Sequence, residues 1–412
     1  MAEENKFSRL DNLILENAKK VSGMDIADIA IFADPDLSLT QWAIALLQED
    51  SQRRLFVGAR DVLQAFATLD LADEAEVTDR VFIAGYQNEI QLDIFFSDAA
   101  SGFGGVIEPA QISLALTHLP KALEELRYFV KSVALAALPD SSFLAGGNNK
   151  YLTRSQNEVF AEVFGKVYAS LGSGKFRCLI AENLREDISL GYQVPVSEQE
   201  FLGEKSADSS YFQLVGVGGV FSGAKPDRGG EFLVQTALPD LHTIFSPLSD
   251  SEVATLKSNA GRDGAEPLFK VLDLGCGNGL ILKNILRDFP DAFGYGSDIS
   301  ADAICSAHMT LLPEILAKRV KFKWDDAARS IPAEEIDVVF LNPPFHQGTA
   351  VDATLVQRLI SGALKTLKSG GVLYLVHNSH LRYRPLLEQG DFAQVNQLGR
   401  NQKFTVLKAV KK

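Results

Sequence analysis

The sequence predicts an α/β fold: two tandem copies of a mostly parallel sheet with helices on both faces, the N-terminal copy degenerate. Three observations support this prediction. Strand and helix patterns alternate in the last third of the chain, a glycine turn follows a buried strand there, and a faint repeat relates the two halves. A length of 412 residues also fits two to three domains.

Short apolar runs alternate with segments of helical periodicity in the C-terminal part. Strands alternating with helices of about ten residues indicate a parallel sheet that is covered on both faces. The strands are expected at 269–274, 292–297, 320–324, 336–341, 372–377 and 404–409, and the helices at 280–288, 301–312 and 356–367.

The internal repeat joins two stretches that each read helix, strand, helix, strand. Its paired positions are Asn148 with Asn378, and Lys175-Phe176 with Lys403-Phe404. Chance similarity between two such units is the alternative. The segment 196–230 is rich in glycine, serine and charge, which favours a domain boundary. We therefore expect domains at 1–210 and 211–412, the first lacking the motifs described below and hence catalytic activity.

Composition excludes several classes of protein. The chain is 46% hydrophobic and 23% charged, which excludes a disordered chain, and no apolar run approaches the ~18 residues of a membrane helix. The first residues lack the pattern of a secretory signal, so we expect a soluble, cytoplasmic protein. Three cysteines without CxxC spacing and six scattered histidines predict neither a disulfide framework nor a metal site.

The net charge of −13 is unevenly distributed. Residues 1–261 contain 21 basic and 37 acidic residues, whereas residues 262–412 contain 19 and 16. An acidic protein is a poor general binder of nucleic acid, but it can carry a local basic groove. Candidate basic residues are Lys318, Arg319, Lys321, Lys323, Arg382, Arg384, Arg400 and Lys403. Solvated helix faces and loop ends are the alternative interpretation.

The first motif, VLDLGCGNG, places a glycine turn between a strand and a helix. Gly275, Gly277 and Gly279 allow the backbone to approach a ligand closely, and the helix N-terminus favours a carboxylate or phosphate. The spacing departs from the GxGxxG of dinucleotide-binding sites. Asp273, which precedes the turn, suits a ligand with an ammonium group and would repel pyrophosphate.

Acidic residues also end the next two predicted strands. Asp298, followed by Ile299, can accept hydrogen bonds from ribose hydroxyls, although Asp298 or Ser300 could instead begin the next helix. Asp326 could accept an adenine amino group. An amino-acid zwitterion, a ribose and an adenine together describe S-adenosyl-L-methionine.

The second motif is Asn342-Pro343-Pro344-Phe345, at the end of a predicted buried strand. The amide oxygen of Asn342 and the carbonyl of Pro343 can accept both hydrogens of a planar amino group, which frees its lone pair for methylation. Phe345 would stack on the base, a contact worth roughly 1–3 kcal/mol. Catalysis would then rest on positioning and electrostatics, and a duplex base would have to be flipped out.

The motifs leave several functions open. The NPPF motif alone does not identify the acceptor, because the N2 of a guanine, the N6 of an adenine and a glutamine amide in a protein all present a planar nitrogen. A non-catalytic RNA-binding scaffold is a third interpretation, and Asp273, Asp298 and NPPF argue against it. A nicotinamide dehydrogenase is disfavoured by the GCGNG spacing and by NPPF.

These residues resemble the class I S-adenosylmethionine-dependent methyltransferases, and more closely the bacterial ribosomal-RNA guanine-N2 methyltransferases. The resemblance covers about residues 215–412 and is carried by GVFS with the following D-x-G, VLDLGCGNG, NPPFHQG and KFTVLKAVKK. NPPFHQG with VHNSHLRY resembles the large-subunit (23S rRNA) member most. Two departures are Gly223, where relatives tend to have Arg, and Asp326, where they often have Asn.

The resemblance implies two tandem Rossmann-like domains, S-adenosylmethionine as cofactor and ribosomal RNA as partner. We also expect a monomeric protein without membrane contact. The resemblance implies guanine contacts at Asn342, Pro343, Pro344 and Phe345. The implied cofactor-binding residues are Asp273, Gly275, Gly277, Gly279, Asp298, Ile299, Asp326 and Asn342.

Overall fold

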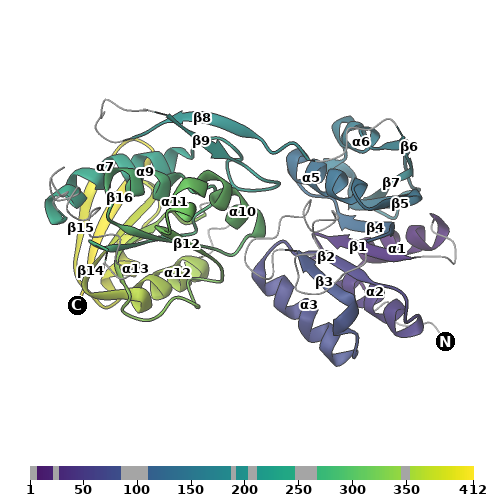
Figure 1. Ribbon diagram of the computed structural model, residues 1–412, viewed down its shortest axis with the longest axis horizontal. Coiled ribbons are helices and arrows are strands. Elements are labelled where there is room, and N and C mark those ends of the chain that lie inside the picture. The colour runs from purple at the N-terminus through teal and green to yellow at the C-terminus, as the bar shows by residue number, and fades with distance from the viewer. Residues whose placement is uncertain are drawn as a thin grey trace. The chain divides into compact units, whose positions relative to one another are not determined.

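The computed structural model describes residues 7–21, 27–84, 110–186, 192–202, 211–245, 267–344 and 353–412. The chain forms two compact units. The N-terminal unit comprises Met1–Val194 with Val217–Gly219, and the C-terminal unit comprises Pro195–Gly216 with Val220–Lys412 (Figure 1). None of the helices in these ranges is sufficiently long and apolar to cross a membrane.

A small hairpin places the division at Val194, earlier than the break after residue 210 that composition suggests. Strand β8 (Val196–Glu200) pairs with β9 (Tyr211–Val215) in a separate two-stranded sheet. The backbone N–H of Val215 donates to Thr310 Oγ1 at 3.0 Å, which attaches the hairpin to the C-terminal unit. The glycine-rich composition therefore marks the neighbourhood of the boundary, and contacts of the hairpin decide its position.

The C-terminal unit alternates strands and helices along the chain. Its strands are β10 (Lys270–Leu274), β11 (Phe293–Asp298), β12 (Val320–Trp324), β13 (Ile336–Leu341), β14 (Leu367–Asn378), β15 (Phe392–Arg400) and β16 (Phe404–Lys411). Its helices are α7 (Arg228–Ile244), α9 (Leu280–Asp288), α10 (Ala301–Thr310), α11 (Leu312–Leu316), α12 (Ala353–Thr366) and α13 (Arg384–Glu388).

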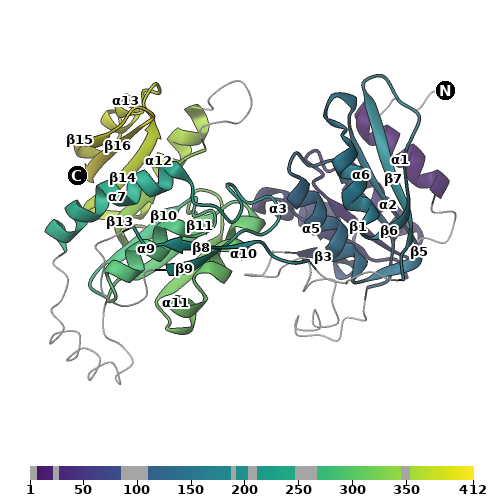
Figure 2. The same cartoon turned by 90° about the horizontal axis from the view of Figure 1, so that it is seen from above.

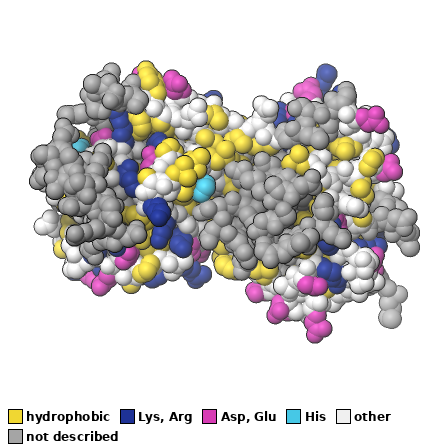
Figure 3. All heavy atoms as spheres, viewed as in Figure 1, with side chains coloured by type: hydrophobic (Ala, Val, Ile, Leu, Met, Phe, Trp, Pro, Cys, Tyr) yellow, Lys and Arg dark blue, Asp and Glu magenta, His cyan; other side chains and the backbone are white. Residues whose placement is uncertain are grey.

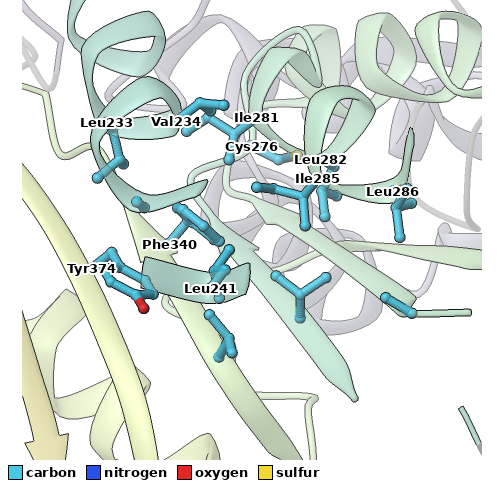
Figure 4. Close-up of a cluster of buried hydrophobic side chains, with 14 of the residues drawn as sticks. Leu233, Val234, Leu241, Cys276, Ile281, Leu282, Ile285, Leu286, Phe340 and Tyr374 are labelled. Atoms are coloured by element: carbon cyan, nitrogen blue, oxygen red, sulfur yellow. The ribbon is translucent and has the colours of Figure 1, made fainter. Parts of the chain in front are cut away.

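The sheet of this unit has the order β12-β11-β10-β13-β14-β16-β15, with β16 antiparallel to both of its neighbours. Helices α7 and α9 pack on one face and α12 and α13 on the other, as Figures 1 and 2 show. Figure 4 shows the first face, where side chains of α7 and α9 meet Phe340 and Tyr374 of the sheet. Burial of large apolar side chains on both faces holds the strand ends in fixed positions.

The N-terminal unit repeats this architecture. Its strands are β1 (Asp28–Phe32), β2 (Leu55–Gly58), β3 (Val81–Ala84), β4 (Ile112–His118), β5 (Ala137–Asn148), β6 (Phe164–Ala169) and β7 (Phe176–Leu184). Its helices are α1 (Arg9–Val21), α2 (Ser38–Glu49), α3 (Val62–Glu74), α5 (Leu123–Ala134) and α6 (Arg154–Ala161), with short 3-10 turns η1 (Thr78–Arg80) and η3 (Asn149–Tyr151).

The strand order β3-β2-β1-β4-β5-β7-β6 matches that of the C-terminal unit strand for strand. Asn148 ends β5 opposite Phe176 of β7, and Asn378 ends β14 opposite Phe404 of β16. The α/β fold with tandem domains is therefore confirmed, as is the register of the repeat that was read from the sequence.

The strands and helices expected between 269 and 409 are all present, with ends within a few residues. Helix α7 was not predicted from the sequence, since its pattern is interrupted by Pro239 and it begins with two glycines. Strand β15 was not predicted either, because it is an edge strand whose side chains are mostly exposed and polar. Strand β15 lacks a buried apolar pattern, whereas α7 does carry apolar residues at helical spacing, so this helix was missed although its pattern is present in the sequence.

Candidate active site

The glycine turn connects β10 to α9 at the carboxyl edge of the sheet. All three glycines have positive φ: 84° at Gly275, 51° at Gly277 and 83° at Gly279. The N–H of Gly275 donates to the carbonyl of Ser297 at 2.7 Å, which ties the turn to the neighbouring strand β11. A Cβ at Gly275 or Gly277 would meet nothing within 4 Å, so these two glycines border open space.

Asp273 lies on β10 directly before this turn and is completely buried. Neither of its carboxylate oxygens has a hydrogen-bond partner among the described residues. Burial, and next the charge of Asp298, raise the pKa of Asp273 well above its ordinary value. A buried carboxylate without partners is costly, and a cation bound beside it would compensate that cost.

Asp298 ends β11 beside the turn. Its Oδ2 accepts from the N–H of Gly277 at 3.0 Å and its Oδ1 from the N–H of Ser300 at 2.9 Å. Burial raises the pKa of Asp298, and these backbone hydrogen bonds oppose that rise. The cap of α10 is Ser300, whose hydroxyl accepts from Ala303 N–H at 3.3 Å, so Asp298 is not needed to begin the helix.

Two further predicted cofactor residues lie at the ends of β11 and β12. The carbonyl of Ile299 accepts from Trp324 Nε1 at 2.8 Å, which fixes the backbone beside Asp298. Asp326 is buried, and its Oδ1 lies 3.3 Å from a guanidinium nitrogen of Arg358 on α12. The oxygen that would accept an adenine amino group therefore already has a cationic neighbour.

Asn342 follows the last residue of β13, at the same edge of the sheet. Its Nδ2 donates to Asp227 Oδ2 at 2.8 Å, whereas its Oδ1 is buried and has no partner among the described residues. Pro343 is buried and Pro344 is exposed. Phe345 lies outside the described residues, so its predicted stacking role stays a prediction.

A second buried acceptor ends the neighbouring strand β14. Asn378 is 6% exposed, and its Oδ1 has no partner among the described residues. The adjacent His377 contacts the carbonyl of Asn378 through Nδ1 at 2.9 Å, and burial lowers the pKa of His377. Acceptor oxygens without partners thus lie at the carboxyl ends of two adjacent strands.

Three residues at this edge had no role predicted from the sequence. Asp227 appeared only within the D-x-G of the resemblance, and Arg358 has no motif around it. Asn278, inside the glycine turn, donates through Nδ2 to the carbonyl of Gly223 at 2.9 Å. An acidic residue followed by glycines at a helix start was the one signal that could have identified Asp227.

The charge distribution agrees with the asymmetry in the sequence. In the view of Figure 3, Lys and Arg side chains cross the visible face of the C-terminal unit, and Asp and Glu are prominent on the N-terminal unit. Arg319 is an exception, because its guanidinium is directed inward. It donates to the carbonyl of Leu286 at 2.6 Å, and burial lowers its pKa.

Comparison with known proteins identifies the class of enzyme to which this site belongs. Residues 254–408 match the family model described as methyltransferase small domain, and residues 105–185 match the RLMG N-terminal domain. A glycine turn bordered by buried carboxylates on a sheet of this order, together with the first match, defines a class I S-adenosylmethionine-dependent methyltransferase.

Individual relatives narrow the class. Ribosomal RNA large subunit methyltransferase G of Shewanella amazonensis is 30% identical over 298 residues, 72% of this chain and 68% of the relative. The protein of that name from Streptomyces coelicolor is 28% identical over 309 residues, 74% of this chain and 73% of the relative. The chain belongs to the ribosomal RNA large subunit methyltransferase G family.

A solved structure supports the whole fold. The T. thermophilus 16S rRNA N2 G1207 methyltransferase, in complex with AdoMet and guanosine, superposes with a TM-score of 0.68 at 20% identity. The superposition covers 99% of this chain and 93% of that one. Both units of the chain therefore have counterparts in a single known architecture.

Proposed function

We propose that this protein transfers a methyl group from S-adenosylmethionine to the exocyclic N2 of a guanine in large-subunit ribosomal RNA. The observation that carries the proposal is the buried Oδ1 of Asn342, which lies beside the glycine turn and has no hydrogen-bond partner within the described parts of the chain. The names of the relatives support ribosomal RNA as the substrate. The structural neighbour was solved in complex with guanosine, which agrees with a guanine acceptor.

The cofactor would be held by groups whose chemistry matches its parts. Asp273 offers a buried negative charge to the ammonium group, and the open space beside Gly275 and Gly277 admits the ligand to the backbone. Asp298 offers carboxylate oxygens to ribose hydroxyls, and Asp326 remains the proposed acceptor for adenine. When bound, S-adenosylmethionine supplies an electrophilic methyl group on a positively charged sulfur.

The acceptor would be held by Asn342 and Pro343. An exocyclic amino group has two hydrogens and a lone pair that is delocalised into the base. Asn342 Oδ1 and the Pro343 carbonyl would each accept one hydrogen, which turns the lone pair toward the methyl group. A new N–C bond then forms as the S–C bond breaks, and the nitrogen afterwards loses one proton to water.

No strong general base is required, because the nitrogen becomes acidic only once it carries the methyl group. The contribution of the protein is to align the reacting atoms and to stabilise positive charge on the amino group with oxygen dipoles. The buried acceptor at Asn378 Oδ1 lies on the next strand, where it could receive a further donor of the base edge, such as the N1–H of guanine.

The test separates the possible acceptors. Ribosomal RNA from cells lacking the protein is incubated with the full-length protein and labelled S-adenosylmethionine, then digested to nucleosides and analysed by mass spectrometry. Label in N2-methylguanosine is the expected result. Label in N6-methyladenosine, label in protein, or cofactor binding without any transfer would each overturn the proposed acceptor.

A further inference from the structure

The Asn342 amide has two ends of almost equal shape, and only one orientation suits methyl transfer. With Oδ1 directed at the acceptor, the amide receives an amino hydrogen. With Nδ2 directed there, two N–H donors would face another N–H donor. The groups that contact the two ends decide which orientation prevails.

Asp227 is the group that distinguishes the two ends. Its Oδ2 accepts from Asn342 Nδ2 at 2.8 Å, while Asn342 Oδ1 is left without a partner among the described residues. A carboxylate accepts hydrogen bonds and cannot donate, so a reversed amide would place its oxygen against another oxygen. The pair therefore favours the orientation in which Oδ1 remains available.

Asp227 is itself held rigidly. It is the N-cap of α7, and its Oδ2 accepts from the N–H of Gly230 at 2.9 Å. The far part of the same helix is anchored by Asp240, which contacts the hydroxyl of Tyr374 and, at 2.7 Å, Lys408 Nζ. Apolar side chains along α7 lie against the sheet between these two ends (Figure 4).

The first glycine after the cap, Gly229, packs closely against the same pair. A Cβ at Gly229 would lie 3.0 Å from Asp227 Oδ2 and 3.2 Å from Asn342 Oδ1. A side chain at this position would press on both partners of the hydrogen bond. The D-R-G-G sequence at the start of α7 thus combines a helix cap, a hydrogen-bond acceptor and the space that the pair needs.

We propose that Asp227 is a positioning residue for methyl transfer, which orients the Asn342 amide so that Oδ1 faces the acceptor nitrogen. The inference rests on the proposed function of Asn342. Asp227 touches neither the base nor the cofactor in this scheme and acts through Asn342 alone.

The test must separate orientation from helix capping. Asp227→Ser keeps a good N-cap residue but removes the acceptor that reaches Asn342. The matched control is Asp61→Ser, which makes the same change at the N-cap of α3, where Asp61 Oδ1 accepts from Gln64 N–H at 2.9 Å. Each variant is assayed as the full chain for kcat on unmethylated ribosomal RNA, for S-adenosylmethionine Kd by calorimetry and for melting temperature.

Asp227→Ser should lower kcat by about 10–100-fold, less than the roughly 100–1,000-fold for removal of a preorganised electrostatic group because the Asn342 amide is still present, and should change the cofactor Kd less than about threefold. Asp61→Ser should leave kcat within about twofold. Asp227→Asn retains one oxygen that can accept both N–H groups, so it should recover at least about tenfold over the serine variant. A kcat for Asp227→Ser equal to that of the control would overturn the inference.

A double variant distinguishes this inference from the function on which it rests. If Asp227 acts only through Asn342, adding Asp227→Ser to Asn342→Ala should reduce kcat no further. An additional tenfold loss would assign Asp227 a separate role. A fully active Asn342→Ala variant would refute the proposed role of Asn342 in methyl transfer, whereas an inactive one beside a fully active Asp227→Ser would refute only the orienting role of Asp227.

Discussion

The two units have one topology and different chemistry at the carboxyl edge of the sheet. In the C-terminal unit Leu274 pairs with Leu341, and Asn342 comes next; in the N-terminal unit Phe32 pairs with Thr117, and His118 comes next. The position that corresponds to Asn342 is thus occupied by a histidine in the N-terminal unit. The backbone position is the same in both units, but the side chain at that position differs, and so does its chemistry.

The turn after the first strand shows the same relation. Ala33 and Leu37 have φ of 42° and 57°, at the same spacing as Gly275 and Gly279 with 84° and 83°. Leu37 caps α2 in the left-handed conformation, as Gly279 caps α9. The first and last positions of the turn keep left-handed geometry without glycine, although it is unfavourable for a side-chain-bearing residue, whereas Pro35, at the position of Gly277, does not have positive φ.

An acid at the start of a helix contacts the end of the fourth strand in both units. Asp11 near the start of α1 lies 2.6 Å from His118 Nε2, and Asp227 at the start of α7 lies 2.8 Å from Asn342 Nδ2. Asp11 and His118 belong to a group with Asp34, in which ligand atoms of the three side chains lie within 4.8 Å of one another. The C-terminal pair differs in containing an amide, whose Oδ1 is buried and has no hydrogen-bond partner among the described residues.

The largest expected effect comes from removing the Oδ1 atom of Asn342. Asn342→Ala should lower kcat by at least ~100-fold and leave the cofactor Kd nearly unchanged, because a preorganised electrostatic group is lost and the glycine turn is intact. Nucleoside mass spectrometry after a timed reaction measures the rate. Matching losses in rate and in cofactor binding would contradict the assignment of Asn342 to the acceptor.

Asp298 is the second difference between the two units. It follows Ser297, the partner of Leu274, whereas in the N-terminal unit the residue after Gly58, the partner of Phe32, is Ala59. Asp298→Ala should weaken S-adenosylmethionine binding by about 10–100-fold, as expected for losing one or two hydrogen bonds to a charged group. Calorimetry measures this Kd, and kcat at saturating cofactor should change much less. A variant with unchanged Kd and reduced kcat would show that Asp298 does not contact the cofactor.

Much of this comparison could be predicted from the sequence, and the reasons differ by residue. Asp273, Asp298 and Asn342 follow apolar runs that identify buried strands, so parallel-sheet geometry brings them to one edge. Asp227 is 115 residues from Asn342 along the chain, and no local pattern indicates their contact. Arg358 contacts Asp326 from helix α12, later in the chain, and no local pattern indicates that contact either. Periodicity identifies elements, whereas contacts between elements depend on packing that periodicity does not describe.

The N-terminal pair should contribute to stability alone. Burial raises the pKa of Asp11, but hydrogen bonds from His118 and Ser8 outweigh it, so the pKa lies below its ordinary value. Asp11→Ala should cost about 1–3 kcal/mol in unfolding free energy at pH 7, because a buried hydrogen-bonded group is lost. Methyl transfer per folded molecule should stay within about twofold.

The pH dependence of this cost has a definite sign. A depressed pKa stabilises the fold above the unfolded-state value, near 3.8 for Asp, and that contribution disappears as pH falls through the folded-state pKa. The difference between wild type and Asp11→Ala in urea melts should therefore be constant near neutrality and shrink below about pH 4. A difference that grew on acidification would exclude the Asp11 carboxylate as its source.

The smallest expected effect concerns Asp273, whose counterpart in β1 is the apolar Ile31. The pKa of Asp273 is raised in the folded protein, so this carboxyl group favours folding at pH values below the unfolded-state pKa. As pH rises through the folded-state pKa, the same group opposes folding. The folded protein must then hold a buried charge that has no partner among the described residues. Without cofactor, Asp273→Asn should therefore be more stable than wild type at pH 7, by roughly 1 kcal/mol or about 2–4 °C. The gain should vanish near pH 4.

Saturating S-adenosylmethionine should reverse this order, since binding stabilises wild type and the variant has lost the charge that attracts the ammonium group. Asp325→Asn is the matched control: that buried carboxylate accepts from the N–H and hydroxyl of Ser330 at 2.7 and 2.8 Å, so its replacement should lower stability. If Asp273→Asn were also destabilised without cofactor, Asp273 would contribute to the stability of the fold, as the hydrogen-bonded Asp11 of the N-terminal unit is expected to do. A stabilised variant that no longer binds cofactor would show that the C-terminal unit retains this charge for its ligand at the expense of its own stability.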